Sequence, residues 1–549
     1  MTRLLVPLLA LAVLWLPPQP AGEYPIQALP LTSVTLTDSF WKPRLDRNRS
    51  VTLPDIFQQN ESSGRVDNFL KAAKQKPGDH TGALQDDAAV YQSLEAASYT
   101  LAVQPDPVLD KKVDELIAIV VAAQERDGYL YTPRSVNPAN PPKGAGLDRW
   151  ASPSTSYELY NMGRMIEAAV AHNLATGKRN LLDAATKAAN LVTNVFGPEK
   201  RRDVSGHPGI ELALVRLSRL TGDGKYLRTA KFILDERTKQ QGADAPLAAS
   251  TDIAVLTDDR VALKSLATAF DTHTAKRLPL TGEPDACATV DGILWYQRMF
   301  LRTADVKYLD VLEKTLFNGF LSGVSAPSNR VSCHADLARL MAQVPTLIYA
   351  QSKEEIFITQ FVGSTAKFPA DGLPLTITQT TEYPWQGRVQ LRLDPAKPLE
   401  TTISIRVPGW VRGEAMPNDA YRYATPGGQG SVTLNGKPFD AVETDGFLQI
   451  RRTWRAADTL VVEFPMAVQR ALAHEGLAEY RDKAAIQRGP LVYAVDVVKG
   501  IKVPINAKLS VIFDKSLLGG LMVIRGPGVT AIPYFAASGR GETIVWLPQ

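Results

Sequence analysis

The sequence predicts a multidomain protein in which a helical domain precedes one or two antiparallel β-sandwiches. Three observations support this fold class. The chain has 549 residues, its middle carries a loose helical repeat, and its apolar periodicity changes from helical to alternating near residue 345. A chain of this length holds two to four domains and buries a sizeable core. Because the helices come first and the strands later, we expect separate domains.

Residues 1–22 are predicted to be a secretory signal peptide. Arg3 precedes the apolar run Leu4 to Leu16, and prolines and the small residues Ala21 and Gly22 follow it. The run is shorter than the roughly 20 residues that span a bilayer, and no other segment is long enough. We therefore expect cleavage near Ala21 or Gly22, export to the periplasm or the extracellular space, and no stable membrane span.

Residues 23–345 are predicted to form helical hairpins. Four similar turn motifs recur at spacings of 45, 36 and 46 residues, and apolar residues at helical spacing flank them. Hairpins of this period either stack as a solenoid or close into an α/α toroid, and periodicity alone leaves both open. The motifs are Thr176-Gly177-Lys178, Thr221-Gly222-Asp223, Thr257-Asp258-Asp259 and Thr303-Ala304-Asp305.

Residues 346–549 are predicted to be antiparallel β-structure, as one or two small sandwiches. Apolar residues alternate with polar ones, and Asn435-Gly436 is a strong signal for a two-residue hairpin. The alternating segments include Leu375/Ile377, Val389/Leu391/Leu393, Ile403/Ile405/Val407 and Val432/Leu434.

Charge and motif content exclude several function classes. Lys and Arg total 61 against 57 Asp and Glu, a net charge of +4 without a dense basic run, so a nucleic-acid surface is not expected. The sequence also contains no Gly-rich phosphate loop, paired-His zinc motif, Gly-x-Ser-x-Gly elbow or Asp-rich calcium loop. Nucleotide chemistry and the common hydrolase mechanisms are therefore excluded.

Aromatic and acidic residues at predicted turns favour a carbohydrate pocket. Sugar rings stack on aromatic faces, and their hydroxyls make directional hydrogen bonds. Simpler explanations stand beside this one: Asp86-Asp87 equally fits a helix cap, Asp127-Gly128 fits a turn, and His207 fits a surface loop. The candidate substrate-binding residues are Asp86, Asp87, Gln124, Asp127, Tyr129, Trp150, Tyr157, Glu158 and His207.

The two cysteines form the sharpest local signal. Asp285-Ala286-Cys287 and Ser332-Cys333-His334 place Cys287 and Cys333 46 residues apart. A carboxylate, two thiols and an imidazole are ligands that Zn²⁺ accepts, so Asp285, Cys287, Cys333 and His334 are candidate zinc ligands. Two buried free thiols, or a disulfide in an exported chain, remain open on the spacing alone.

Several motifs in the same order resemble the β-L-arabinofuranosidases of glycoside hydrolase family 127 and its relative family 146. The resemblance covers nearly all of the chain after residue 22. The motifs that carry it are Ser156 to Gly163, Ile166 to His172 with Ala175 to Lys178, and Gly206-His207 with Ile210 to Leu214. Further matches are Phe40-Trp41, Asn68-Phe69, Asp127 to Leu130, Tyr308 to Glu313 with Asn318-Gly319, Asp445 to Phe447, and Arg488 to Tyr493.

This resemblance implies an (α/α)6 barrel followed by β-sandwiches, and retaining hydrolysis at a zinc-bound cysteine. In the family a Glu-x-Cys element and a Cys-Cys pair bind zinc, the first cysteine of the pair attacks the anomeric carbon, and an upstream glutamate is the general acid. Zinc keeps the sulfur as a thiolate and makes it a competent leaving group. The implied substrates are arabinose-containing glycans.

The chain departs from the family pattern at the chemical groups. The resemblance places Ser332 at the nucleophile, Cys333 at the second cysteine and Asp285 at the zinc-binding glutamate, while Cys287 is retained. A serine hydroxyl is hardly ionised at neutral pH, so it is a poor substitute for a zinc thiolate. The segment that carries the acid is shortened, which leaves Glu283 as the local substitute.

Two hypotheses of different class follow. The first is an exported glycosidase that hydrolyses terminal arabinofuranosyl residues of plant-type glycans, with Cys333 or Ser332 as nucleophile and Glu283 as acid. The second is a catalytically inactive relative that binds glycans or serves a structural role. Family histidines around the sugar are replaced as well, by Tyr157 at one position and Arg164 at another. A polysaccharide lyase on the same toroid ranks last, because the sequence lacks a clear basic constellation.

Overall fold

Six helices between Asp87 and Gln343 form a closed inner ring. The computed structural model describes residues 23–549 except Ser205 and residues 242–245, 277–285, 326–330, 371–372, 498–501, 518–519 and 538–541. Each inner helix contacts the next in chain order, and the last returns to contact the first. The inner helices are α4 (Asp87–Val103), α7 (Glu158–Thr176), α9 (Ile210–Thr221), α11 (Leu247–Leu256), α13 (Ala286–Thr303) and α16 (Val331–Gln343).

A second layer of helices packs outside this ring, one against each inner helix. The inner helix α4 is buried on nearly every face, whereas the outer helix α8 buries only a stripe that includes Leu181, Ala185 and Val192. The closed double layer is the (α/α)6 arrangement, so a toroid is confirmed and a solenoid is wrong. The outer helices are α2 (Leu53–Ser62), α5 (Pro107–Ala122), α8 (Asn180–Val195), α10 (Gly224–Gln241), α12 (Arg260–Lys276) and α14 (Val306–Lys314).

The four repeated turn motifs connect inner to outer helices, as predicted. α7 and α9 end at Thr176 and Thr221, and the following Gly177 and Gly222 both have φ of 73°. A left-handed residue after the last helical turn satisfies orphan carbonyl groups, which glycine does without steric cost. The other two turns use Asp258 (φ 49°) and Ala304 (φ 62°) in comparable conformations. The other helical segments before the C-terminal sheets are η1 (Leu31–Ser33), α1 (Trp41–Arg47), η2 (Asn48–Thr52), α3 (Arg65–Ala72), α6 (Thr132–Ser135), η3 (Thr315–Phe320), α15 (Leu321–Ser325) and η4 (Val344–Leu347); η5 (Ala478–Tyr480) lies between strands.

Two sheets follow the helices and share one apolar core. Val389, Leu391 and Leu393 of one sheet and Ile403 and Ile405 of the other are fully buried in that core. The first sheet has the strand order β1 (Gln27–Ala28), β3 (Tyr349–Gln351), β4 (Glu355–Ile358), β8 (Leu399–Arg406), β13 (Phe447–Trp454), β12 (Val442–Thr444). The second has the order β11 (Lys437–Pro438), β10 (Ser431–Leu434), β14 (Asp458–Glu463), β7 (Arg388–Pro395), β6 (Leu373–Thr381), β5 (Ser364–Ala370), β2 (Val34–Leu36).

A third sheet completes the C-terminal region. Its main strand order is β18 (Ser510–Asp514), β19 (Leu521–Gly526), β20 (Val529–Pro533), β17 (Leu491–Asp496), β16 (Lys483–Arg488), β15 (Val468–Ala473), β9 (Tyr421–Tyr423); β21 (Thr543–Ile544) and β22 (Trp546–Pro548) pair with β17 and β16. The hairpin at Asn435-Gly436 joins β10 to β11, and both residues have positive φ, as a two-residue turn requires. Short helices α17 (Gly409–Arg412) and α18 (Tyr534–Ala537) lie in connections.

Strand pairing departs from the sequence expectation in two places. β4 pairs with β8 in parallel, within sheets that are otherwise antiparallel. The N-terminal strands β1 and β2 join the C-terminal sheets, and Thr35 pairs with Thr365. Residues 27–28 and 34–36 therefore pair with strands of the sheets, although the sequence assigned all of 23–345 to the helical domain. These strands have two and three residues, too few for an alternating pattern to identify them.

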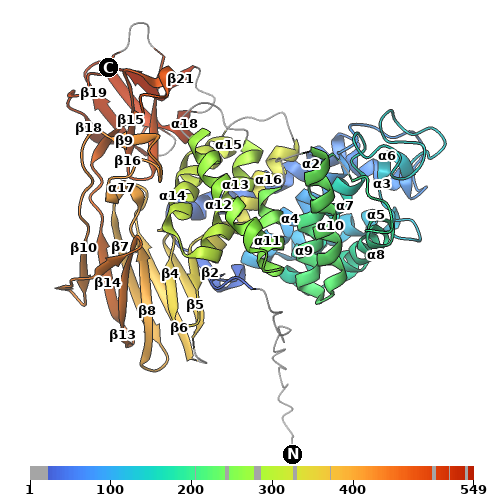
Figure 1. The fold of residues 1–549 in the computed structure, drawn as a ribbon, viewed down its shortest axis with the longest axis horizontal. Helices are drawn as coiled ribbons and strands as arrows, with labels where there is room; N and C mark the ends of the chain where they lie inside the picture. The colour runs from blue at the N-terminus through green and yellow to red at the C-terminus, as the bar shows by residue number, and fades with distance from the viewer. Residues whose placement is uncertain are drawn as a thin grey trace, which may run out of the picture.

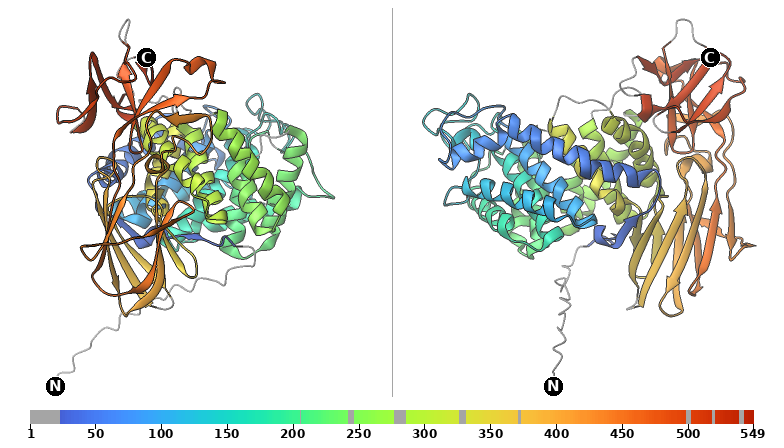
Figure 2. Two further views of the ribbon diagram at one scale, coloured as in Figure 1. Left: turned by 60° about the vertical axis from the view of Figure 1, so that its left-hand side comes forward. Right: turned by 180° about the vertical axis from the view of Figure 1, so that it is seen from behind.

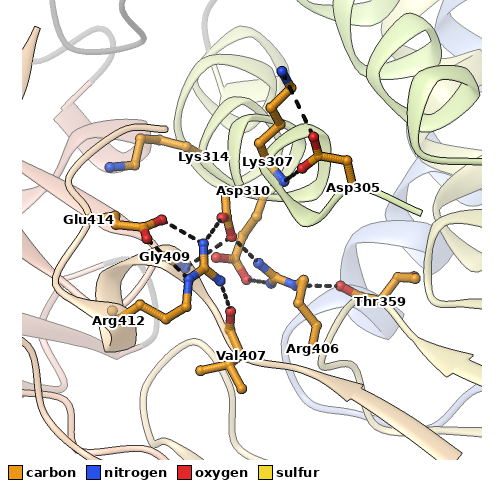
Figure 3. Close-up of polar contacts among 12 residues, drawn as sticks. Asp305, Lys307, Asp310, Lys314, Thr359, Arg406, Val407, Gly409, Arg412 and Glu414 are labelled. Carbon is orange, nitrogen blue, oxygen red and sulfur yellow. Dashed lines mark hydrogen bonds and ion pairs between the residues drawn. The ribbon is translucent and has the colours of Figure 1, made fainter. Parts of the chain in front are cut away.

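An ion-pair network joins α14 to the sheets (Figure 3). The Asp310 carboxylate accepts hydrogen bonds from Arg406 Nη1 at 2.9 Å, Arg412 Nη2 at 2.6 Å and the Gly409 backbone N–H at 3.0 Å. Arg406 is fully buried, and its guanidinium also pairs with Glu313. Figures 1 and 2 show the helical ring lying beside the three sheets, with α14 at the contact. The network fixes the two parts relative to each other.

Candidate functional site

A cavity of about 580 Å³ opens into the ring where five inner helices begin. Residues of α7, α9, α11, α13 and α16 line it, together with residues that directly precede α7, α9 and α11. Their side chains are aromatic, acidic and basic, with an apolar wall from α11 that includes Leu247. A deep pocket with an apolar body and a few polar groups is the usual form of a small-ligand site. The cavity is therefore the candidate functional site.

Two stacked rings form one side of the cavity. Tyr157 and His207 lie parallel, with ring centroids 3.7 Å apart and an angle of 10° between the planes. Hydrogen bonds to Glu211 stabilise the loop that carries His207. The Glu211 carboxylate accepts from the Gly209 backbone N–H at 3.0 Å and from Arg237 Nε at 2.6 Å. Burial and the Arg237 guanidinium lower the pKa of His207, which favours the neutral ring.

A buried charged network lies below the stacked rings. Glu167 pairs with Arg164 at 2.9 Å and with Arg216 at 3.2 Å. Arg216 also pairs with Glu95 at 3.0 Å, and Glu95 with Arg339 at 3.5 Å. Arg339 in turn lies 3.0 Å from Asp336. Each of the three carboxylates thus has an arginine partner, and the pairs connect α4, α7, α9 and α16. We call these six residues the charged network: Glu95, Arg164, Glu167, Arg216, Asp336 and Arg339.

Asp291 lies in the same cavity but outside these pairs. Its side chain is exposed to the cavity space, and among the described residues it has no hydrogen bond or ion pair. Charges surround it all the same, with Arg164, Asp336, Arg339 and Glu167 acting on it. Because the cavity lies inside the ring, the carboxylate is partly desolvated there, which raises the pKa of Asp291, and the Arg164 guanidinium opposes that rise.

The sequence reasoning missed Glu167, Asp291 and Asp336 as cavity residues. A usable signal was present, because Asp291 is four residues after Cys287 on α13, and Asp336 is four residues after Ser332 on α16. Residues four apart share one face of a helix.

Of the candidate sugar-binding residues, Tyr157 and His207 line the cavity and the other seven do not. Asp86 is the residue preceding α4; its carboxylate accepts from the Ala83 backbone N–H at 3.0 Å and pairs with Arg65 at 3.4 Å. Asp87 accepts from the Thr132 backbone N–H at 2.8 Å and from Thr132 Oγ1 at 2.5 Å. Both aspartates therefore hold the structure around the start of α4.

Glu158 organises the loop before α7. Its carboxylate accepts hydrogen bonds from Tyr129 Oη at 2.6 Å, from Ser156 Oγ at 2.8 Å and from the Trp150 backbone N–H at 3.1 Å. Trp150 has a φ of 64°, a strained conformation for a bulky residue that these bonds help to maintain. Glu158 is thus a buried support behind the cavity wall.

Gln124 and Asp127 stabilise one turn. Gln124 Nε2 donates to the carbonyl oxygens of Gly128 at 3.0 Å and of Ala184 at 2.8 Å. Asp127 Oδ1 accepts from the Tyr129 backbone N–H at 3.2 Å, and its other oxygen pairs with Arg149. The turn explanation of Asp127-Gly128 accounts for these contacts.

The predicted chemical groups lie mostly outside the described residues. The structure does not describe Glu283 and Asp285. It places Cys287 on α13 and Ser332 and Cys333 on α16 but does not describe their side chains. His334 is half-buried on α16. The assignment of nucleophile, acid and zinc ligands therefore stays a prediction.

The described residues contain one group with the composition of a metal site. Ligand atoms of Asp110, Asp114 and His172 lie within 4.8 Å of one another, without an ion. The Lys178 ammonium donates to Asp110 at 2.7 Å and to Asp114 at 2.6 Å, so a cationic side chain already occupies the space between the two carboxylates and offsets one of their two charges. This group lies near the end of α7 opposite to Tyr157, roughly 20 Å away along the helix, and is separate from the cavity.

Comparisons with known proteins agree over almost the whole chain. The profile of the β-L-arabinofuranosidase GH127 catalytic domain matches residues 33–269 and 268–334, that of the GH127 middle domain matches 355–466, and that of the family 127 C-terminal domain matches 468–548. A non-reducing end β-L-arabinofuranosidase of Bifidobacterium longum subsp. longum is 27% identical, with 90% of this chain and 93% of that protein covered.

Two solved structures are similar in both sequence and fold. A GH127 β-arabinofuranosidase superposes with a TM-score of 0.89 at 32% identity, covering 96% of this chain and 98% of that one. A GH127 β-L-arabinofuranosidase from Geobacillus stearothermophilus T6 superposes with a TM-score of 0.84 at 27% identity, covering 94% and 99%. The similarity extends over the helical ring and all three sheets.

Proposed function

The chain belongs to the β-L-arabinofuranosidase family, glycoside hydrolase family 127, and on that premise we propose that it hydrolyses terminal β-L-arabinofuranosyl residues of plant-type glycans outside the cytoplasm. The chain is a GH127 β-L-arabinofuranosidase-like hydrolase. The substrate linkage, the reacting groups, zinc and export are the parts that we propose.

The cavity is the observation that carries this proposal. It is large enough for one pentose and part of its neighbour, and the stacked pair Tyr157 and His207 offers an aromatic surface beside carboxylates. Ala288, which directly follows Cys287, lines the cavity. Asp336, four residues after Ser332, lines it from α16. These two neighbours in sequence support the proposal that the reacting groups act at this cavity.

The proposed reaction uses a nucleophile from Cys333 or Ser332 and a proton donor at Glu283. The nucleophile attacks the anomeric carbon while Glu283 protonates the departing oxygen, and water then hydrolyses the glycosyl intermediate. The donor set of Asp285, Cys287, Cys333 and His334 fits zinc, because thiolate, imidazole and carboxylate are its usual ligands. α13 and α16, which carry three of these four residues, contact each other. Bound zinc would hold a cysteine sulfur as the thiolate.

Export is proposed from the sequence of residues 1–22. Among the described residues, no helix has the length and apolar character needed to cross a bilayer.

A second function is supported by one specific observation. Ser332 stands where the family resemblance places the nucleophilic cysteine, and a serine without an adjacent base is a poor nucleophile. The alternative is therefore an inactive relative that retains the ring and cavity to bind glycans.

Zinc content and turnover together test the proposal. We would measure zinc stoichiometry of the purified mature protein and arabinose release from p-nitrophenyl β-L-arabinofuranoside, for the wild type, Cys333→Ala and, as a control, Asp419→Asn at an exposed position of the β region. One zinc per chain with turnover that Cys333→Ala abolishes supports the proposed reaction. No zinc and no turnover, with arabinan binding intact, supports the binding function.

A further inference from the structure

Asp291 differs electrostatically from every other carboxylate of the cavity. Glu167 and Asp336, which also line it, each have an arginine within 3.2 Å. Asp291 has no such partner among the described residues, yet it stands in the cavity among charged side chains. Its two oxygens therefore retain acceptor capacity that no neighbouring side chain of the described chain uses.

The surroundings keep this carboxylate oriented toward the cavity space. Asp291 projects from α13, whose residues Ala288, Gly292 and Trp295 also line the cavity, so that face of the helix is the cavity wall. The neighbouring guanidinium groups of Arg164 and Arg339 are engaged by Glu167 and Asp336. Both guanidinium groups therefore pair with carboxylates of the charged network, and neither makes an ion pair with Asp291, whose side chain lines the cavity.

We propose that Asp291 is the residue that binds ring hydroxyls of the sugar in this cavity, and so selects for a sugar whose hydroxyls are free at that position. This inference rests on the proposed function, since it identifies the cavity as the sugar site. Two neighbouring hydroxyls can donate to the two oxygens of one carboxylate, and such charge-assisted bonds are about twice as strong as neutral ones. In this role Asp291 binds and positions the sugar, and the bond-breaking groups lie elsewhere.

A ligand that cannot be hydrolysed separates this inference from the question of activity. We would titrate 1,4-anhydro-L-arabinitol, which has the ring hydroxyls but no leaving group, into the full-length mature protein and follow binding by calorimetry. The variants are Asp291→Asn, which keeps the shape and removes the charge, and Asp291→Ala. Asp419→Asn, at an exposed residue of the β region, is the matched control. Because Asp291 makes no hydrogen bond or ion pair among the described residues, both variants should fold, which their melting temperatures check.

The expected result is a loss of affinity of about tenfold or more for Asp291→Asn, with the control unchanged, because hydrogen bonds to a charged acceptor are stronger than those to a neutral amide. A 2-deoxy or 3-deoxy ligand that lacks one bonded hydroxyl should bind the wild type more weakly, and Asp291→Asn should weaken its binding by a smaller factor than it weakens binding of the parent ligand. A purely structural effect would not produce this coupling.

Two results would overturn the inference. One is wild-type affinity in both Asp291 variants. The other is strict additivity, in which each deoxy ligand loses the same factor in wild type and variant. Failure of the proposed function is recognised separately, as an absence of turnover of p-nitrophenyl β-L-arabinofuranoside while the ligand still binds.

Discussion

The rings of Tyr157 and His207 lie face to face, 3.7 Å apart at the centroids and 10° from parallel, although the two residues are 50 positions apart in the chain. Tyr157 precedes the first residue of α7, and His207 belongs to the loop before α9. The contact therefore joins the entrances of two adjacent inner helices at the cavity.

Removing the histidine ring should weaken sugar binding. His207→Ala takes away one of the two stacked rings and frees Tyr157 to rotate, so we expect a two- to tenfold lower affinity for 1,4-anhydro-L-arabinitol, from the roughly 0.5–1.5 kcal/mol of such aromatic pairs. His207→Phe keeps an aromatic ring and should retain most of the affinity. Calorimetry on both variants checks this, and equal affinity of His207→Ala and wild type would contradict it.

Gly163 should not tolerate a side chain. A Cβ at this position would lie 2.9 Å from the backbone carbon of Gly209 and from the backbone nitrogen of Ile210, atoms that cannot rotate away. Gly163→Ala should push α7 from the start of α9, costing about 1–3 kcal/mol and lowering sugar affinity by displacing the His207 loop. Chemical denaturation measures the cost.

Gly224→Ala is the matched control for that substitution. Its Cβ would meet only the end of the flexible Arg228 side chain, 3.3 Å away. We expect it to change stability by less than about 1 kcal/mol. If both glycine variants lose equal stability, the close approach of α7 and α9 is not the cause.

The Asp310 carboxylate should be the main polar support between the helical ring and the sheets. Asp310→Asn leaves the buried Arg406 and the partly buried Arg412 without their shared anion, so we expect a loss of about 3–5 kcal/mol in unfolding free energy. Glu400→Gln, which breaks the exposed pair with Arg451 at 3.5 Å, should cost less than about 1 kcal/mol. Comparable losses in the two variants would show that burial of the network is unimportant.

Acid should destabilise the protein partly through His80. Burial lowers the pKa of His80 to about 4, from an ordinary value near 6.5. The unfolded chain binds this proton at a higher pH than the folded chain, so stability is present above about pH 6.5 and declines as the pH falls toward 4. His80 is partly solvated, which limits its share to about 1–2 kcal/mol.

His80→Gln isolates that share. The difference in unfolding free energy between pH 7 and pH 4 should be smaller in this variant than in the wild type. Denaturant unfolding at the two pH values measures it. An identical pH dependence in both proteins would show that His80 titrates normally in the folded state.

The sequence by itself determined the local features of the fold, those that depend only on residues close together in the chain. The four turn motifs, the helices on either side of them and the hairpin at Asn435-Gly436 were all predictable, because helical and strand periods and turn conformations are local properties. The family resemblance added the toroid and the candidate chemistry, and the turn explanation of Asp127-Gly128 was already visible.

Only the tertiary structure decided the features that depend on contacts between distant segments: the closure of the ring, the strand pairing and the lining of the cavity. The contact between α16 and α4 closes the ring, and the pairing of Thr35 with Thr365 places an N-terminal strand in a C-terminal sheet. The same closure brings Asp291 and Asp336 into one cavity with the Tyr157–His207 pair and leaves Glu158 as a support behind it. The physical reason is that the burial and pairing of a charged side chain depend on which helices surround it, and a single segment does not encode that.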